Sequence, residues 1–263
     1  MKQPRIVEHA ALTPFDWLVN AMLRAVASWS GGKDSCLACY KAILSGFRVA
    51  CLLNIISREN RVMSHGLDSN LIVAQSEAIG IPIIQRETTW ETYEEVFKDT
   101  LKELKERMHI EYAVFGDIHI QEHLDWISRV CMEVGVVPVE PLWHIDCEAI
   151  LTELIDAGFE AVLVNVRADI FGNEWLGRKI DRNLIEDFKK LLESCSFDLC
   201  GEFGEYHTLV VDGPIFAKRL KILESEKTLK EGYWKYWLLN ISKYALEDKK
   251  GYEKEKTRYN PIL

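Results

Sequence analysis

The pattern of apolar and polar residues divides the chain into two halves. In the first half, short apolar runs typical of buried strands alternate with segments whose apolar residues recur at helical spacing. The apolar runs cover residues 23–29, 47–57, 81–87, 112–116 and 136–139, and the helical segments cover 36–44, 70–79, 90–109 and 124–134. This alternation predicts an α/β fold with a doubly wound parallel sheet and helices on both faces. The ligand of such a sheet lies at the carboxyl ends of the strands, where the winding direction reverses.

The pattern changes after residue 143. Helical periodicity covers 147–157 and 184–192, and strand-like runs cover 161–166, 206–212, 215–223 and 233–241. These elements predict a smaller α+β C-terminal domain in which the last strands meander. We therefore expect an N-terminal extension (1–22), a parallel-sheet domain (23–143), a second domain (144–245) and a charged tail (246–263).

Composition narrows the class of protein. The net charge of −9 argues against broad nucleic-acid binding, and no apolar segment is long enough to span a membrane. The seven cysteines are an odd number scattered in apolar contexts, which favours reduced thiols and a cytoplasmic protein over a disulfide framework. Cys36 and Cys39 form a C-x-x-C pair, for which a core position, a redox role and a metal role remain alternatives.

A phosphate-binding loop is predicted between the first strand and the first helix. It consists of Ser30, Gly31, Gly32, Lys33, Asp34 and Ser35. Glycines let the backbone approach an anion, and the free N–H groups and dipole of a helix N-terminus favour negative charge. Lys33 adds a positive charge, and Asp34 can hold a metal ion that accompanies the phosphates.

This loop resembles the pyrophosphate loop (PP-loop) of the N-type ATP pyrophosphatases, which carry the pattern SGGxDS on a Rossmann-like (HUP-type) sheet. The resemblance implies that residues 23–143 bind ATP with Mg²⁺, and that ATP is split into AMP and pyrophosphate. If the first and fourth strands are neighbours, Gly116 and Asp117 face the loop. His65, in the loop after the second strand, is a further candidate for contact with adenine.

Further segments resemble one family in that superfamily, the diphthine–ammonia ligases. They are G-D-I at 116–118, P-L-W at 141–143, W-L-G-R at 175–178 and G-E-F-G-E-Y-H-T at 201–208, the last followed by D-G-P-I-F at 212–216. The resemblance implies a ligase that forms a C–N bond: it adenylates a carboxylate, releases pyrophosphate, and couples the product to ammonia with release of AMP. In the named case the carboxylate belongs to diphthine on elongation factor 2.

The resemblance also implies roles for residues of the second domain. Glu202 and Glu205 would bind ammonium or accept its proton, and would be catalytic together with Lys33 and Asp34. Candidates for substrate contact are Trp175, Arg178, His207 and Thr208. Packing is the competing interpretation for Trp175, and a surface ion pair for Arg178.

The chain departs from the family pattern at two positions, where Phe203 replaces a glycine and His207 replaces a glutamate. This variant resembles a bacterial and archaeal branch proposed to act on another carboxylate, in cobalamin salvage. An imidazole at 207 leads us to expect a pH dependence near 6–7. Transfer of sulfur to tRNA and a non-catalytic ATP- or AMP-binding regulator remain alternatives, and a homodimer is one open oligomeric state.

Two more histidines lie near the predicted site. His119 and His123 are four residues apart and would share a helix face if their segment is helical, so together with Asp117 they could ligate a divalent metal. Lining a nucleotide pocket or capping a helix is the alternative for both imidazoles.

Overall fold

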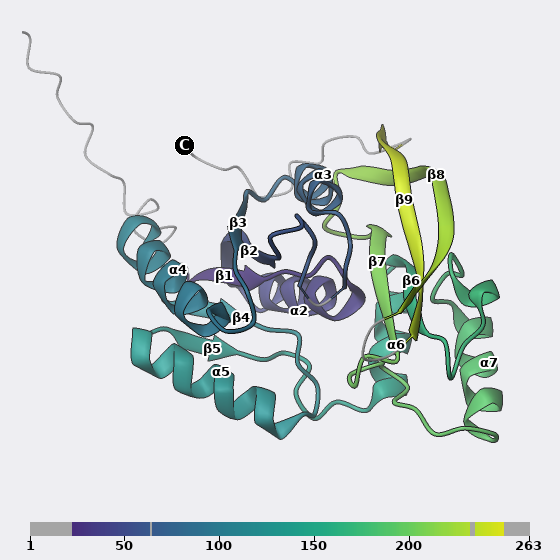
Figure 1. Cartoon of the computed structure of the whole chain (residues 1–263). Helices are drawn as coiled ribbons and strands as arrows, with labels where there is room; N and C mark the ends of the chain where they lie inside the picture. Colours follow the sequence, from purple (N-terminus) through teal and green to yellow (C-terminus); the bar gives the residue numbers. More distant parts are fainter. Residues whose placement is uncertain (1–22, 64, 232–234, 250–263) are drawn as a thin grey trace, which may run out of the picture.

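The computed structural model describes residues 23–63, 65–231 and 235–249 (Figure 1). The predicted N-terminal extension, most of the predicted charged tail and residues 232–234 lie outside the described residues. The described chain forms two sheets, and helices pack around both. Each half of the sequence forms one of the two sheets.

The first half forms a five-stranded sheet in which every neighbouring pair is parallel. The strand order is β3-β2-β1-β4-β5. The strands are β1 (Arg24–Ser28), β2 (Arg48–Ile56), β3 (Ile83–Glu87), β4 (Tyr112–Val114) and β5 (Val137–Val139). All five predicted strands are confirmed, and so is the predicted Rossmann-like α/β fold class.

Helices cover both faces of this sheet. They are α2 (Lys33–Leu44), α3 (Ser69–Ile79), α4 (Tyr93–Met108) and α5 (Gln121–Val134). Because side chains alternate along a strand, β1 sends Ala25 and Ala27 into the core beneath α2 and α3, and Val26 into the core beneath α4 and α5. The apolar residues of β1 are therefore buried from both faces of the sheet.

The winding direction reverses between β1 and β4, which pair in parallel from Ala25 opposite Tyr112 to Ala27 opposite Val114. The chain leaves β1 into the 30–35 loop and leaves β4 into Gly116 and Asp117. The predicted meeting of these two segments is confirmed: a Cβ on Gly116 would lie 2.8 Å from the carbonyl carbon of Asp34. Only glycine allows the two backbones to approach this closely.

The second half forms an antiparallel sheet in the order β7-β6-β9-β8. Its elements are α6 (Cys147–Asp156), β6 (Glu160–Arg167), the short 3₁₀ helix η1 (Asn173–Trp175), α7 (Arg182–Leu192), β7 (Tyr206–Asp212), β8 (Lys218–Glu231) and β9 (Lys235–Asp248). The smaller α+β domain is confirmed.

The last two strands are longer than predicted. We expected them to end at 223 and 241, but they end at Glu231 and Asp248, so β9 enters the segment predicted to be a charged tail. The residues of β8 after Leu223 are mostly charged and exposed, and they are held by backbone pairing to β9 instead of by a buried face. A hydrophobic pattern does not detect a strand of that kind.

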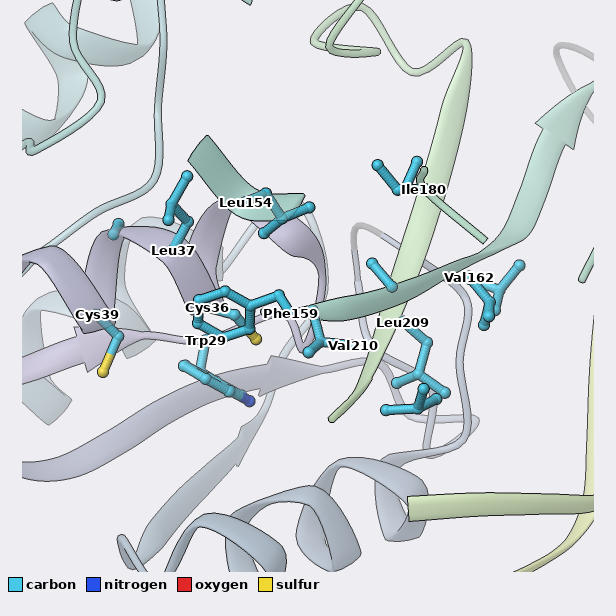
Figure 2. Packing of buried hydrophobic residues seen from close by; sticks show 14 of the residues in the cluster. Trp29, Cys36, Leu37, Cys39, Leu154, Phe159, Val162, Ile180, Leu209 and Val210 are labelled. Atoms are coloured by element: carbon cyan, nitrogen blue, oxygen red, sulfur yellow. The ribbon is translucent and has the colours of Figure 1, made fainter. Parts of the chain in front are cut away.

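One hydrophobic core runs through both domains. Trp29 and Cys36 of the first domain belong to the same buried cluster as Phe159, Leu209 and Val210 of the second (Figure 2). The packing fixes β7 beside the 30–35 loop, and this contact places residues of the second domain over the carboxyl edge of the parallel sheet.

Candidate active site

A cavity of about 440 Å³ lies at the carboxyl edge of the parallel sheet, with walls from both domains. Its volume is that of a pocket for a small molecule. The predicted site residues on its wall are Ser30, Lys33, Asp34, Ser35, His65, Gly116, Asp117, Glu202, His207 and Thr208. The others, which do not line it, are Gly31, Gly32, Trp175, Arg178 and Glu205.

The 30–35 loop has the conformation expected of an anion-binding turn. Helix α2 begins at Lys33, so the last three residues of the motif lie in its first turn, where N–H groups have no intrahelical acceptor. Gly31 has a φ of +82°, and a Cβ there would lie 2.6 Å from Cδ1 of Ile72. Both the conformation and the lack of space require glycine.

Gln75, which the sequence analysis did not single out, fastens the loop to the second domain. Its side-chain amide is fully buried, and its Nε2 donates to the carbonyl oxygens of Gly31 (3.0 Å) and Val210 (2.7 Å). Its Oε1 accepts from the indole of Trp29 at 2.8 Å. The helix also carries Asn70, Ser76 and Glu77, so no pattern in the sequence marks Gln75 as the buried polar residue.

Thr208 makes the second link between the loop and β7. Its hydroxyl accepts a hydrogen bond from the backbone N–H of Lys33 at 2.9 Å, as a capping side chain would. Gly32 is the N-cap residue and has no side chain to do this. The phosphate loop is therefore preorganised by a residue 175 positions away in sequence.

Lys33 and Asp34 form an ion pair at the base of the cavity. Nζ of Lys33 lies 2.8 Å from Oδ2 of Asp34, donates to the carbonyl oxygen of Cys200, and lies 5.0 Å from the ring centroid of Tyr206. Burial opposes the charge of Lys33, but its neighbours Asp34, Tyr206 and Cys200, with Asp34 foremost, together outweigh burial and hold the lysine pKa above its usual value. The cavity thus has a permanent cation where phosphates would bind.

Asp34 has the free oxygen that a metal ion would need. Its Oδ1 is buried and has no hydrogen-bond partner, and burial raises the pKa of the carboxyl group. An oxygen ligand of this kind suits Mg²⁺, which binds through one or two carboxylates and substrate phosphates. The residues present therefore fit the metal that the PP-loop resemblance implies.

Glu202 projects from the second domain into the cavity. Its Oε2 accepts a hydrogen bond from the N–H of Ile118, just beyond β4, at 3.2 Å. Burial, followed by the negative charge of Asp34, raises the pKa of Glu202 to about 7. A carboxyl group with a pKa near neutrality can both accept and return a proton at physiological pH.

Glu205 is buried beneath the same loop. Its two carboxylate oxygens accept hydrogen bonds from the backbone N–H groups of Asp198 (2.9 Å) and Phe203 (3.1 Å). These bonds fix the turn that carries Glu202. The contact of Glu205 with ammonia stays a prediction. Its hydrogen bonds to the backbone of the turn are those of a residue that positions Glu202.

His65 and His207 stack in the wall of the cavity, with ring centroids 4.6 Å apart and an interplanar angle of 26°. Burial, followed by the charge of Lys33, lowers the pKa of His207 to about 4, and burial and His207 lower the pKa of His65. Both imidazoles are therefore neutral at pH 7. The pH dependence near 6–7 that we expected from His207 is wrong, because the sequence does not reveal its burial.

Trp175 and Arg178 do not line the cavity. Arg178 Nη2 lies 2.5 Å from Oδ2 of Asp187, and its guanidinium lies 4.6 Å from the ring centroid of Trp175. Trp175 also stacks on Phe188 of α7, with centroids 5.4 Å apart. Trp175 thus makes packing contacts and Arg178 forms an ion pair, which are the alternatives to substrate contact stated above for these two residues.

The predicted Asp117–His119–His123 metal site does not form. Helix α5 begins at Gln121, so His119 precedes it and does not share a helix face with His123. His123 Nδ1 instead lies 2.9 Å from Oδ1 of Asp117, and His119 Nε2 lies 3.3 Å from Oδ2 of Asp198.

Cys36 and Cys39 are core residues of α2. Both are fully buried, and burial raises the pKa of the Cys39 thiol to about 12 and that of Cys36 above its usual value. Neither lines the cavity. Burial of this kind makes a thiol inert, which favours the structural interpretation over a persulfide or redox role.

An aromatic wall was missed in the sequence. It lines the cavity and consists of Trp90 before α4, Tyr93 and Phe97 of α4, Phe115 after β4, and Trp126 of α5. Tyr93 stacks between Trp90 (5.9 Å) and Phe97 (6.1 Å), and Trp90 is 70% exposed. The spacing of residues 90, 93 and 97 on one helix face was the available signal, but it is also the spacing of a core face.

Together, the switch-point cavity, the SGGxDS loop and its Lys–Asp pair define the PP-loop class of nucleotide-binding enzymes. Two family models match the chain: the diphthamide synthase N-terminal domain over residues 23–138 and the diphthamide synthase C-terminal domain over 146–246. The chain therefore belongs to the diphthamide synthase family, as the sequence motifs predicted.

Named relatives of the chain support the same family assignment. The diphthine–ammonia ligase of Danio rerio is 27% identical in an alignment of length 252 that covers 86% of this chain and 98% of the relative. That of Homo sapiens is 29% identical in an alignment of length 229 that covers 78% of this chain and 84% of the relative. A solved structure, a "predicted subunit of tRNA methyltransferase" from Methanocaldococcus jannaschii, covers 73% of this chain and 98% of its own at 15% identity and a TM-score of 0.42.

The family and its relatives make the chain an ATP-dependent amide-forming ligase, with a nucleotide and ammonia among its substrates. This confirms the predicted enzyme class and the use of ATP. In the part of the chain that the structure describes, no helix is both long and apolar enough to cross a membrane.

Proposed function

We propose that the chain adenylates a carboxylate at this cavity and then couples the acyl-adenylate to ammonia, with Glu202 as general base. The observation that supports this most is that one cavity carries the Lys33–Asp34 pair and, from the other domain, a carboxyl group with a pKa of about 7. A protein that only senses a nucleotide has no use for a titratable carboxyl group opposite its phosphate loop.

The residues of the first domain would hold ATP. Lys33 and the first-turn N–H groups of α2 would bind the leaving pyrophosphate, and Trp90 with the aromatic wall would receive the flat face of adenine. Asp34 would hold Mg²⁺, which when bound neutralises phosphate charge. An oxygen of the substrate carboxylate attacks the α-phosphorus, and the bond to the pyrophosphate oxygen breaks.

Glu202 would act in the second half of the reaction. Ammonia attacks the acyl carbon, its nitrogen becomes positively charged, and the bond from that carbon to the AMP oxygen breaks. The carboxylate of Glu202 takes the proton that the new amide nitrogen must lose. Glu205 would keep Glu202 in place through its hydrogen bonds to the backbone of the turn.

For the substrate we propose diphthine on elongation factor 2, supported by the diphthine–ammonia ligases among the relatives of this chain. The rival is a smaller carboxylate, as in cobalamin salvage, and the departures at Phe203 and His207 bear on it. His207 lines the cavity, where it would contact a bound substrate, whereas Phe203 is outside the lining and is 64% exposed on the turn that carries Glu202. Sulfur transfer to tRNA finds no support in the buried cysteines of α2.

The test uses elongation factor 2 purified with its diphthine unamidated, together with ATP, Mg²⁺ and ¹⁵N-ammonium. We expect AMP and pyrophosphate in equal amounts and one ¹⁵N atom in the modified histidine by mass spectrometry. Formation of ADP would overturn the adenylation chemistry. AMP formation with a small carboxylate but none with elongation factor 2 would keep the chemistry and overturn diphthine as the substrate.

A further inference from the structure

A second group of ligand-type side chains lies at the domain interface, outside the residues that line the cavity. His119 belongs to the segment after β4, Cys147 is the first residue of α6, and Asp198 lies in the loop before β7. Nε2 of His119 is 3.3 Å from Oδ2 of Asp198, and Sγ of Cys147 is 3.9 Å from the same oxygen. One ligand atom from each residue lies within 4.8 Å of the other two.

These separations suit a single metal ion. With metal–ligand bonds of about 2.0–2.3 Å in tetrahedral geometry, neighbouring ligand atoms lie roughly 3.3–3.8 Å apart. The His119–Asp198 and Cys147–Asp198 separations are already close to that range. The side chains of His119 and Asp198 are 31% and 14% exposed, so an ion can reach the group from solvent.

The ligand chemistry selects the ion. A thiolate and an imidazole favour zinc-type transition metals, whereas Mg²⁺ prefers oxygen ligands only. Cys147 begins a helix, where the dipole and free N–H groups favour the thiolate that binds metal. We propose that His119, Cys147 and Asp198 form a binding site for Zn²⁺ or a similar divalent transition metal, with the fourth position open.

Asp198 would connect this ion to the active-site turn. Its Oδ1 accepts hydrogen bonds from the N–H groups of Cys200 (2.9 Å) and Glu202 (3.2 Å), while its Oδ2 faces His119 and Cys147. A metal on Oδ2 leaves the bonds on Oδ1 in place. The ion would therefore fix, from three chain segments, the turn that presents Glu202.

Titration of the full-length, chelator-treated protein with Co²⁺ and Zn²⁺ tests the site. We expect one ion bound per chain and a cobalt spectrum with a thiolate-to-metal charge-transfer band. Cys147→Ser should abolish that band, and His119→Ala should weaken affinity at least about tenfold, the lower bound seen even for outer-shell partners. Cys195→Ser, the same change three residues before Asp198, is the matched control and should alter neither.

Several outcomes would overturn the proposal. Wild-type protein that binds no stoichiometric ion, or binds Co²⁺ without a thiolate band, has no such site. An unchanged spectrum in Cys147→Ser would place the ion elsewhere. Circular dichroism checks that each variant is folded. If Cys147→Ser does not fold, the presence or absence of the thiolate band in the cobalt spectrum of the wild-type protein decides the proposal. Excess Mg²⁺ should not displace the ion, and displacement by it would show a site of oxygen ligands instead.

Discussion

Replacing Glu202 by Gln tests the general base with little change of shape. The variant keeps an oxygen that can accept from the Ile118 N–H and loses only the ionisation. General bases contribute typically about 10²–10⁴-fold to a rate, so amide formation should fall by that factor, or about 3–5 kcal/mol of barrier. ATP affinity should change little, because Glu202 contacts the nucleophile in this mechanism and not the phosphates.

The same substitution should stabilise the protein at high pH. A Glu202 pKa raised from 4.5 to about 7 corresponds to about 3 kcal/mol, as an order of magnitude. Because the folded state binds the proton more tightly, this stability is present below pH 4.5 and is lost as pH rises through about 7. The Gln variant has no such loss, so above pH 7 it should resist urea better than wild type by up to about 3 kcal/mol.

The assay follows AMP formation and urea unfolding on both sides of pH 7. The wild-type rate should rise with pH through an inflection near 7, and the Gln variant should lack the inflection. Glu106→Gln, the same change on the exposed face of α4, is the control and should behave as wild type. A Glu202→Gln variant with the wild-type rate, or with the inflection intact, would refute the assignment.

Four other substitutions probe the cavity. Lys33→Ala should weaken ATP binding about 10- to 150-fold, the value of a charge-assisted contact of roughly 1.5–3 kcal/mol, and unchanged calorimetric affinity would contradict the phosphate-loop role. Trp90→Ala should weaken ATP but not pyrophosphate binding, by roughly 1–3 kcal/mol for a lost base stack; equal losses for both ligands would exclude adenine stacking there. Gly116→Ala should cost roughly 1–3 kcal/mol in urea unfolding, because its Cβ would meet the Asp34 backbone at 2.8 Å, and wild-type stability would show that the loops can separate. Burial lowers the pKa of the His207 imidazole to about 4, so wild-type stability falls as pH falls from 6.5 toward 4, and His207→Gln should reduce that loss. The variant should keep the inflection of the rate near pH 7, and loss of that inflection would assign it to His207.

The sequence alone determined the architecture of the first domain. A buried parallel strand is a short apolar run and its crossover helix has a 3.6-residue period, so both signals are local. The PP-loop was equally visible, because its chemistry lies in six consecutive residues. The family followed from the more specific motifs of the second half, and Glu202 was found through them.

The tertiary structure decided what each carboxylate and imidazole can do. Glu202 and Glu205 are three residues apart and look equivalent in the sequence, yet one lines the cavity and the other is held beneath the turn by two backbone N–H groups. His207 has its pKa lowered by burial, which depends on the packing of β7 against the loop. Such properties come from contacts between residues far apart in the chain, as between Thr208 and Lys33, and no local pattern encodes them.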